Sequence, residues 1–268
     1  MGRIVDTGTD VVTAEVRDRM GVLTLNRPDR MNALHADMYP AIKKVLAGWA
    51  SDDEVAVLVL TGAGKGFCAG GDVRDGSQRR ADPNAPRPSR EDRVVSLTSD
   101  AQTVQAIFEF PKLSIGAING AAAGAGVSLA LCTDLRIASS KAKLISGWNN
   151  LAFTGDFGGI WFLEKLIGPA RTLEFAVSGS PMDAETGHAL GVFNAVVPVE
   201  SFESEWPKWA AKFANAPVSS VSGFKANVRD AMHMPFAEYL KIESARMVDS
   251  SYTQDHKNAV KAWLEARK

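Results

Sequence analysis

The sequence predicts an α/β fold followed by a helical C-terminal region. Strand-like and helical apolar patterns alternate in a β-β-α-β order between residues 11 and 61. Two loops of small residues each follow an apolar strand-like run, and the pattern after Val199 is predominantly helical. We therefore expect an α/β core over residues 1–200 and a helical region over residues 201–268.

The first part of the core consists of three predicted strands and one helix. Strands are expected at Val11–Val16, Gly21–Asn26 and Val55–Thr61, and a helix from about Ala36 to Ala50. Pro28 and Asp29 end the second strand, because proline cannot donate to a ladder and aspartate favours a turn. Residues 74–93 are rich in Pro, Arg and Asp without an apolar period, which predicts an exposed or mobile loop.

The second part of the core contains both a buried strand and a glycine turn. A helix is expected at Val94–Phe110, and a buried strand, Leu113–Ile118, leads into the second small-residue loop. Another strand follows at Leu135–Ala138. A Gly-rich turn, Thr154–Gly159, then opens a helix that Gly168 and Pro169 are expected to stop after Ile167.

Composition excludes several classes of partner. The 30 Lys and Arg residues nearly balance the 31 Asp and Glu residues, so no global field attracts nucleic acid or an anionic membrane. The two cysteines form no disulfide framework, and the first ten residues lack the apolar stretch of a signal peptide, so we expect a cytoplasmic protein. No His/Cys cluster has metal-ligand spacing, and we expect no metal.

The two small-residue loops, Gly66–Asp72 and Asn119–Gly126, offer backbone N–H groups with little side chain in the way. Oriented donors stabilise the negative charge that develops on a thioester oxygen, each contributing about 2.7–4 kcal/mol. A helix beginning near Ala125 would add the positive end of its dipole. The alternative is that these glycines only satisfy turns and close packing.

Four segments carry a family resemblance: Asn26–Leu34, Gly64–Asp72, Ile118–Gly126 and Gly155–Gly159. In this order and spacing the chain resembles the enoyl-CoA hydratase/isomerase (crotonase) superfamily from about residue 10 to residue 265. The resemblance implies a crotonase-like spiral of β-β-α turns. It also implies a helical C-terminal region that assembles a homotrimer or a dimer of trimers, and an acyl-CoA substrate. Coenzyme A is then part of the substrate, and no permanently bound cofactor is expected.

The resemblance also implies positions for the site residues. The oxyanion donors are the N–H groups of Gly71 and Ala125. The CoA ester is expected to contact Arg30, Ala33, Cys68, Ala69, Gly70, Gly71, Asp72, Val73, Ala125 and Lys225. Two of these positions have simpler interpretations, because Cys68 suits a small buried residue and Lys225 suits a solvated surface charge.

The chain departs from the hydratase pattern at two positions. Ser128 and Trp148 stand where hydratases of the superfamily carry two glutamates, and neither side chain is a carboxylate base. The remaining carboxylate is Asp156, eight positions after Trp148, and some isomerases of the superfamily resemble this chain in placing an aspartate there. We therefore expect a double-bond shift through a thioester enolate, with Asp156 as acid and base. The alternative reaction is hydration of a 2-enoyl-CoA.

The role of Asp156 is open in two respects. Loss of hydration would raise its pKa, whereas a hydrogen bond from the Trp148 indole would lower it. Trp148 is expected either to orient Asp156 or to pack on the acyl group. Asp156 could instead cap the helix that begins near Gly158.

Two further functions are weaker alternatives. Aromatic-CoA dehalogenases of the superfamily share the spacing of Trp148 and Asp156, but they use a histidine in the helix that corresponds to Val94–Phe110. That helix contains no histidine here. A non-catalytic acyl-CoA-binding protein would keep the fold and have no acid or base in its site.

Overall fold

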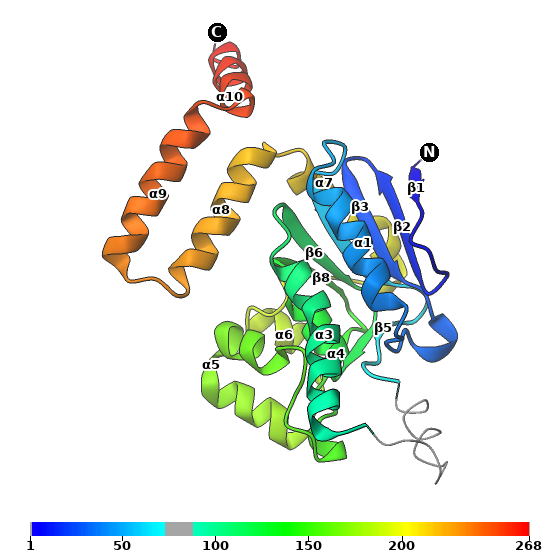
Figure 1. Cartoon of the computed structure of the whole chain (residues 1–268). Helices are drawn as coiled ribbons and strands as arrows, with labels where there is room; N and C mark the ends of the chain where they lie inside the picture. Colours follow the sequence, from blue (N-terminus) through cyan, green and yellow to red (C-terminus); the bar gives the residue numbers. More distant parts are fainter. Residues whose placement is uncertain (1, 73–87, 268) are drawn as a thin grey trace.

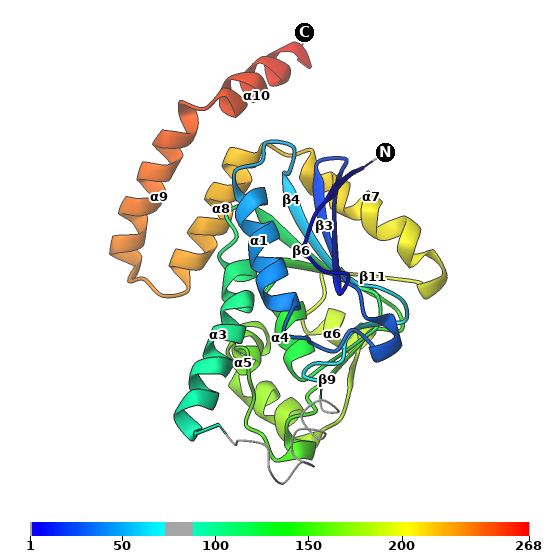
Figure 2. The same cartoon turned by 45° about the vertical axis from the view of Figure 1, so that its right-hand side comes forward.

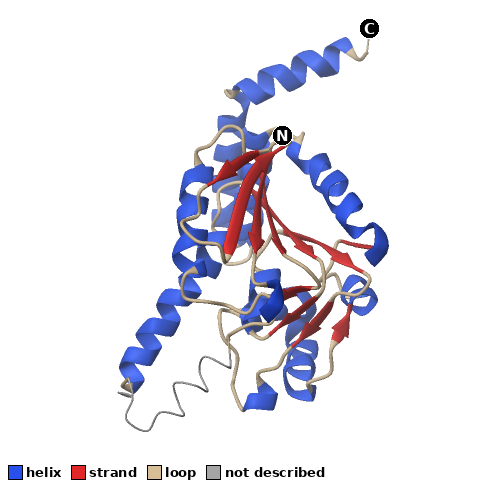
Figure 3. Cartoon of the chain, turned by 90° about the vertical axis from the view of Figure 1, so that its right-hand side faces the viewer, coloured by secondary structure: helices blue, strands red, loops and turns tan. Residues whose placement is uncertain are grey.

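The computed structural model describes residues 2–72 and 88–267, and a seven-stranded sheet forms its centre (Figure 3). The order is β1-β2-β3-β4-β6-β8-β11. The strands are β1 (Arg3–Val5), β2 (Val12–Arg17), β3 (Met20–Leu25), β4 (Val57–Gly62), β6 (Leu113–Ile118), β8 (Leu135–Ser139) and β11 (Ala195–Val197). β1, β2 and β3 pair antiparallel and the later pairs are parallel. Every residue of β4 and β6 is buried, as their apolar runs predict.

A four-stranded second sheet lies beyond the ends of these strands (Figure 3). It runs β10-β9-β7-β5, with β5 (Gly66–Cys68), β7 (Ala121–Ala123), β9 (Lys143–Ile145) and β10 (Met182–Asp183). β5 and β7 are parallel neighbours, and Cys68 lies opposite Ala122. This pairing places the two small-residue loops side by side.

Helices cover both faces of the main sheet (Figure 1). The helices of the core are α1 (Met38–Ala50), α3 (Arg90–Phe108), α4 (Ala125–Leu131), α5 (Gly159–Ser178), α6 (Ala184–Ala189) and α7 (Phe202–Ala214), with short 3₁₀ turns η1 (Pro28–Arg30), η2 (Asn149–Leu151) and η3 (Val199–Ser201). The larger core includes Trp49 of α1 and Ile107 of α3. A second core on the opposite face includes Phe202 and Trp206 of α7. α4 packs against α5, which brings the second loop to the Asp156 turn.

The last three helices project from this core as an arm (Figures 1 and 2). They are α8 (Val218–Ala231), α9 (Phe236–Ser251) and α10 (Gln254–Glu265). α9 and α10 contain no buried residue. The division of the chain at residue 201 stays a prediction, and the packing shows that α7, the first helix after it, contacts the main sheet.

The expected core elements are present with shifted ends. Gly168 has φ +76° and ψ 168°, which is not helical, so the first stretch of α5 ends after Ile167 as expected, and Pro169 begins a second helical stretch that reaches Ser178. Proline is tolerated there because the first turn of a helix needs no N–H donor. Most of the loop predicted at residues 74–93 falls outside the described residues, and its end forms the first turn of α3. Among the described helices, none combines the length and the apolar character that a membrane crossing requires.

Candidate functional site

The two small-residue loops touch each other through their glycines. Gly70 has φ +82°, and a Cβ at this position would lie 2.5 Å from the carbonyl oxygen of Ala123 and 3.2 Å from the nitrogen of Ala125. A Cβ at Gly126 would lie 2.1 Å from the carbonyl oxygen of Cys68. Close packing therefore requires both glycines, and it is this packing that sets the spacing of the two rows of N–H groups.

The predicted donor residues lie at the ends of these loops. Gly71 is exposed, and open space surrounds the position that its Cβ would take. Ala125 is the first residue of α4, and the first N–H groups of a helix have no acceptor within that helix. The preceding residue, Gly124, donates its N–H to the carbonyl of Ile145 at 3.0 Å. The loop is thus fixed just before α4 begins.

Trp148 and Asp156 are joined by a hydrogen bond beside the second loop. The indole Nε1–H of Trp148 donates to Oδ1 of Asp156 at 2.9 Å. The same Nε1 lies 3.8 Å from the position of a Cβ on Gly124, so the buried indole adjoins the start of α4. The structure therefore brings Gly70, Ala125, Trp148 and Asp156 together through consecutive contacts.

Ser128 forms a hydrogen bond with the backbone of the Asp156 turn. Its buried hydroxyl donates to the carbonyl oxygen of Asp156 at 3.0 Å. Gly159 lies against both groups, since a Cβ there would be 2.6 Å from the Ser128 Oγ and 2.7 Å from the Trp148 ring. The three residues pack so closely that the turn has one position relative to α4.

The carboxyl group of Asp156 does not cap a helix. α5 begins at Gly159, its N-cap is Gly158 in the left-handed region, and no side chain accepts a capping hydrogen bond there. The capping interpretation is therefore wrong. Burial raises the pKa of Asp156, and the hydrogen bond from Trp148 offsets part of that rise. Of the two opposing effects expected from the sequence, loss of hydration is the larger.

Two titratable residues escaped the sequence analysis, Tyr39 of α1, which lies near both Asp156 and Asp100, and Asp100 of α3. The Tyr39 ring lies 6.1 Å from the Phe157 ring between centroids. Burial raises the pKa of Tyr39, and the charges of Asp100 and Asp156 add to this effect. Burial also raises the pKa of Asp100 against the opposing charge of Lys43. The available signal was helical spacing, because Asp100 lies one turn before buried Val104 and therefore on an inward face.

The expected CoA-binding segments are held together by Arg27. Its guanidinium donates to the Ala33 carbonyl at 2.7 Å and pairs with the Asp72 carboxylate at 3.1 Å. The Ala69 N–H donates to the carbonyl of Met31 at 2.9 Å. These contacts join η1 to the first small-residue loop. Arg30 is exposed beside them, and Val73 lies outside the described residues.

Cys68 is fully buried, and burial raises the pKa of its thiol to about 12. A thiol with this pKa is protonated at neutral pH, so Cys68 is a small packing residue.

Lys225 is not a solvated surface charge, as one interpretation of the sequence had it. Its side chain is buried, and the ammonium pairs with Asp134 at 2.6 Å and donates to the Lys112 carbonyl at 2.9 Å. Burial lowers the pKa of Lys225 to about 8, against the opposing effect of Asp134. These contacts fix α8 to β6 and occupy the ammonium that was expected to meet a CoA phosphate.

The whole chain is similar to known proteins. The family model described as enoyl-CoA hydratase/isomerase matches residues 15–268. The chain belongs to the enoyl-CoA hydratase/isomerase family. It is 32% identical to the 1,2-epoxyphenylacetyl-CoA isomerase of Escherichia coli, over 96% of this chain and 97% of that protein. It is 31% identical to the crotonyl-CoA hydratase of Syntrophomonas wolfei, over 96% of each.

Solved structures of the enoyl-CoA hydratase/isomerase family share the fold. An enoyl-CoA hydratase subunit from Geobacillus kaustophilus superimposes with a TM-score of 0.85 at 31% identity, over 96% of both chains. An enoyl-CoA hydratase/isomerase from Mycobacterium abscessus gives a TM-score of 0.86 at 28% identity, over 95% of this chain and 96% of that one. The crotonase fold expected from the sequence is confirmed, and the chain is an enzyme of this family.

Proposed function

We propose that this enzyme shifts a double bond in an enoyl-CoA ester, with Asp156 as its acid and base. One observation carries the proposal, the hydrogen bond that holds a desolvated carboxylate beside the start of α4. The two positions at which hydratases of the superfamily carry glutamates hold Ser128, which is bonded to the Asp156 backbone, and Trp148, which is bonded to its side chain.

In this proposal the thioester carbonyl lies between the N–H groups of Gly71 and Ala125. Asp156 removes a proton from the α carbon of a 3-enoyl ester, and the electron pair moves onto the thioester oxygen as an enolate. The two N–H groups stabilise this charge. Asp156, now protonated, delivers a proton to the γ carbon, and the double bond moves to the 2 position. No atom is gained or lost.

Exchange of the α proton with solvent deuterium tests this function. The Asp156→Asn variant should lose α-proton exchange and turnover by at least about 100-fold, which is typical of losing a general base. Binding of a saturated acyl-CoA should persist. Retained exchange in the variant would contradict the assignment of Asp156, and binding without turnover by the parent enzyme on 2-enoyl, 3-enoyl and aromatic CoA esters would favour a non-catalytic acyl-CoA-binding protein.

Hydration of a 2-enoyl-CoA is the second candidate, and Asp100 is the observation that favours it. The charges of Asp100 and Asp156 both act on Tyr39, so two carboxyl groups with raised pKa lie around one ring. A hydratase needs groups that position and activate water. Incorporation of ¹⁸O from labelled water into a 3-hydroxyacyl product would establish this activity. The absence of such a product during complete isomerisation would exclude it.

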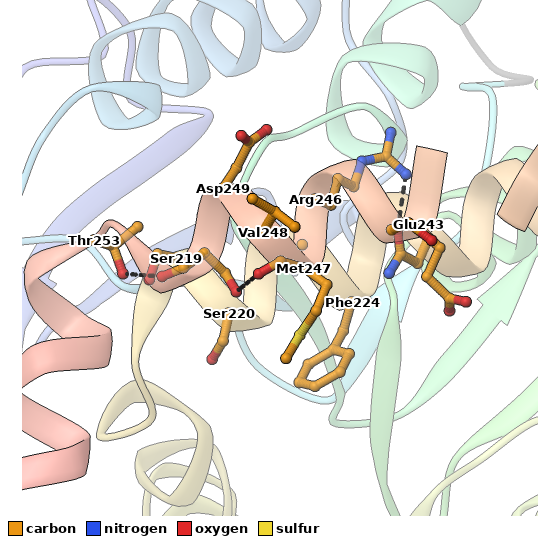
Figure 4. A pocket seen from close by; sticks show the side chains of 13 residues that line it. Ser219, Ser220, Phe224, Glu243, Arg246, Met247, Val248, Asp249 and Thr253 are labelled. Atoms are coloured by element: carbon orange, nitrogen blue, oxygen red, sulfur yellow. Dashed lines mark hydrogen bonds between the residues drawn. The ribbon is translucent and has the colours of Figure 1, made fainter. Parts of the chain in front are cut away.

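We also propose that the arm assembles the enzyme into a homotrimer or a dimer of trimers. Figure 4 shows the cavity between α8 and α9, about 760 Å³ in volume, which Phe224 and Met247 line. Both side chains are largely exposed, as are Phe236 and Tyr252 further along the arm. A second copy of the chain is the expected partner, because family resemblance assigns this region to assembly and the exposed residues belong to every copy.

A further inference from the structure

A cavity bordered by aromatic rings adjoins Phe157 and Gly158, the two residues that follow Asp156. It lies between α3 and α5 and has a volume of about 340 Å³. Four of the residues that line it are aromatic: Phe108, Phe157, Trp161 and Phe162. Gln105 and Glu109, which share a hydrogen bond of 3.0 Å, lie at its polar edge on α3. The cavity is thus a mostly apolar space with one polar side.

The position of Phe157 connects this cavity to the proposed reaction site. Phe157 directly follows Asp156 and adopts φ +51°, a left-handed conformation that is unusual for a large side chain. Its ring is buried against Tyr39 and also lines the cavity. If Asp156 acts on the α and γ carbons, the next part of the acyl group meets Phe157 and then the cavity. The inference below therefore rests on the proposed function.

The far wall of the cavity is a cluster of three rings in edge-to-face contact. The centroid of the Trp161 ring lies 5.7 Å from that of Phe108 and 5.1 Å from that of Phe162, with interplanar angles of 79° and 87°. Phe108 and Phe162 are 5.5 Å apart. Each ring is held by the other two, and Arg229 lies 4.4 Å above Phe108. The wall therefore presents ring edges and faces in fixed directions.

The same three rings separate this cavity from a second one. Phe108, Trp161 and Phe162 are the residues that line both this cavity and a neighbouring cavity of about 360 Å³ between the core and α8. The partition is one layer of side chains thick. The partition limits how deeply an extended alkyl chain of the substrate can enter the first cavity. A planar ring in that cavity keeps edge-to-face contact with the wall.

We propose that the cavity between α3 and α5 binds an aromatic ring at the distal end of the acyl group, and that Trp161 determines this specificity. A flat ring gains directional contacts with the wall that a flexible alkyl chain of equal carbon number does not gain. Trp161 lines both cavities and contacts both other rings. The preferred substrates are accordingly aryl-substituted enoyl-CoA esters.

Binding of two esters with ten acyl carbons each and no alkene tests this proposal without requiring turnover. We expect 4-phenylbutanoyl-CoA to bind the intact protein about 3- to 10-fold more tightly than decanoyl-CoA, measured by calorimetry. Trp161→Leu removes the ring, keeps an apolar residue and opens the partition. In this variant the preference should fall to about 1 or reverse. Phe108→Leu weakens the same wall and should change the ratio in the same direction.

Trp209→Leu is the matched control, because Trp209 forms an edge-to-face pair with Phe213 at 4.9 Å in the other core, away from the cavity. The ratio of its affinities for the two esters should equal that of the parent protein. A parent ratio of 1 or less, or an unchanged ratio in both wall variants, would overturn the proposal. Turnover of 4-phenylbut-2-enoyl-CoA and dec-2-enoyl-CoA is measured separately, so failure of the proposed reaction leaves the binding ratio interpretable.

Discussion

Two opposing effects act on the pKa of the Asp156 carboxyl group. Burial raises its pKa, and the hydrogen bond from Trp148 lowers it without cancelling the rise. A base must be ionised to accept a proton, so activity of the proposed kind requires a pH above this raised pKa. In the proposed reaction the donor at Trp148 would therefore extend the working range of the enzyme toward lower pH.

Trp148→Phe should move the acidic limb of the pH profile to higher pH. Phenylalanine keeps most of the packing but removes the N–H donor, so the pKa of Asp156 rises further. The dependence of kcat/KM on pH, measured with a 3-enoyl-CoA, reports the pKa in the free enzyme. Activity should fall most at acidic pH and recover toward the parent value as the pH rises. A shift of the limb to lower pH would contradict this account.

Asp156→Asn should stabilise the folded protein at alkaline and neutral pH. The folded state disfavours the ionised carboxylate, so this cost is present above the raised pKa and is lost as the pH falls through it toward the ordinary value. Thermal unfolding should show a higher Tm for the variant, with a difference that shrinks in acid. For a chain of this size about 1 kcal/mol corresponds to roughly 2–4 °C. A Tm difference between variant and parent that grows as the pH falls would contradict this prediction.

At the scale of elements, the glycines fix how closely β5 approaches the start of α4. The nearest atoms to a Cβ on Gly126 or Gly70 are backbone atoms of the opposite loop, which cannot rotate away as a side chain can. The separation of the two N–H groups is therefore set by backbone contact and not by the residues that carry the groups.

Gly126→Ala should impair both folding and activity. The methyl group would meet the Cys68 carbonyl at 2.1 Å, so β5 and α4 must move apart. We expect a loss of stability of about 1–3 kcal/mol, typical of overpacking, together with a loss of turnover. Gly48→Ala is the matched control, because Gly48 is an exposed position of α1 at which a Cβ would meet no atom of another element within 4 Å. Alanine should stabilise that helix by up to about 1 kcal/mol. Equal effects at both positions would contradict this explanation.

Elements that depend on a local apolar pattern could be predicted from the sequence. The strand at Leu113–Ile118 and the helix at Ala125–Leu131 follow from apolar runs and from the glycine loop between them. The sequence was insufficient where a contact joins distant residues. The role of Ser128 depends on the Asp156 backbone 28 positions away, and the environment of Lys225 depends on Lys112 and Asp134, the residues that immediately precede β6 and β8.

At the scale of the whole molecule, the core and the arm differ in how far they bury their apolar side chains. The core buries most of its large apolar side chains in two clusters on the two faces of the main sheet. The arm buries none in α9 or α10, although it carries Phe236, Leu240, Tyr252 and Trp263. The helical pattern was visible in the sequence, but hydrophobic spacing alone cannot distinguish a face packed within one chain from a face left for another copy.

Charged substitutions on the arm should dissociate the proposed assembly. Met247→Asp together with Tyr252→Asp places carboxylates on exposed apolar positions, and their burial in an interface would be costly. Light scattering should give a multiple of 28.7 kDa for the parent protein and a single chain for the variant. Lys257→Asp, at an exposed polar position of α10, should leave the assembly intact. A parent protein that is monomeric at micromolar concentration would refute the proposal.

The hydrogen bond between Trp148 and Asp156 has a stereochemical consequence. It occupies Oδ1, so in the proposed reaction the proton that travels between the α and γ carbons would be carried by Oδ2 of the same carboxyl group. A single oxygen would reach the planar enolate from one side only. We therefore expect the proposed double-bond shift to be suprafacial, with part of a deuterium label placed on the α carbon reappearing on the γ carbon of the same molecule.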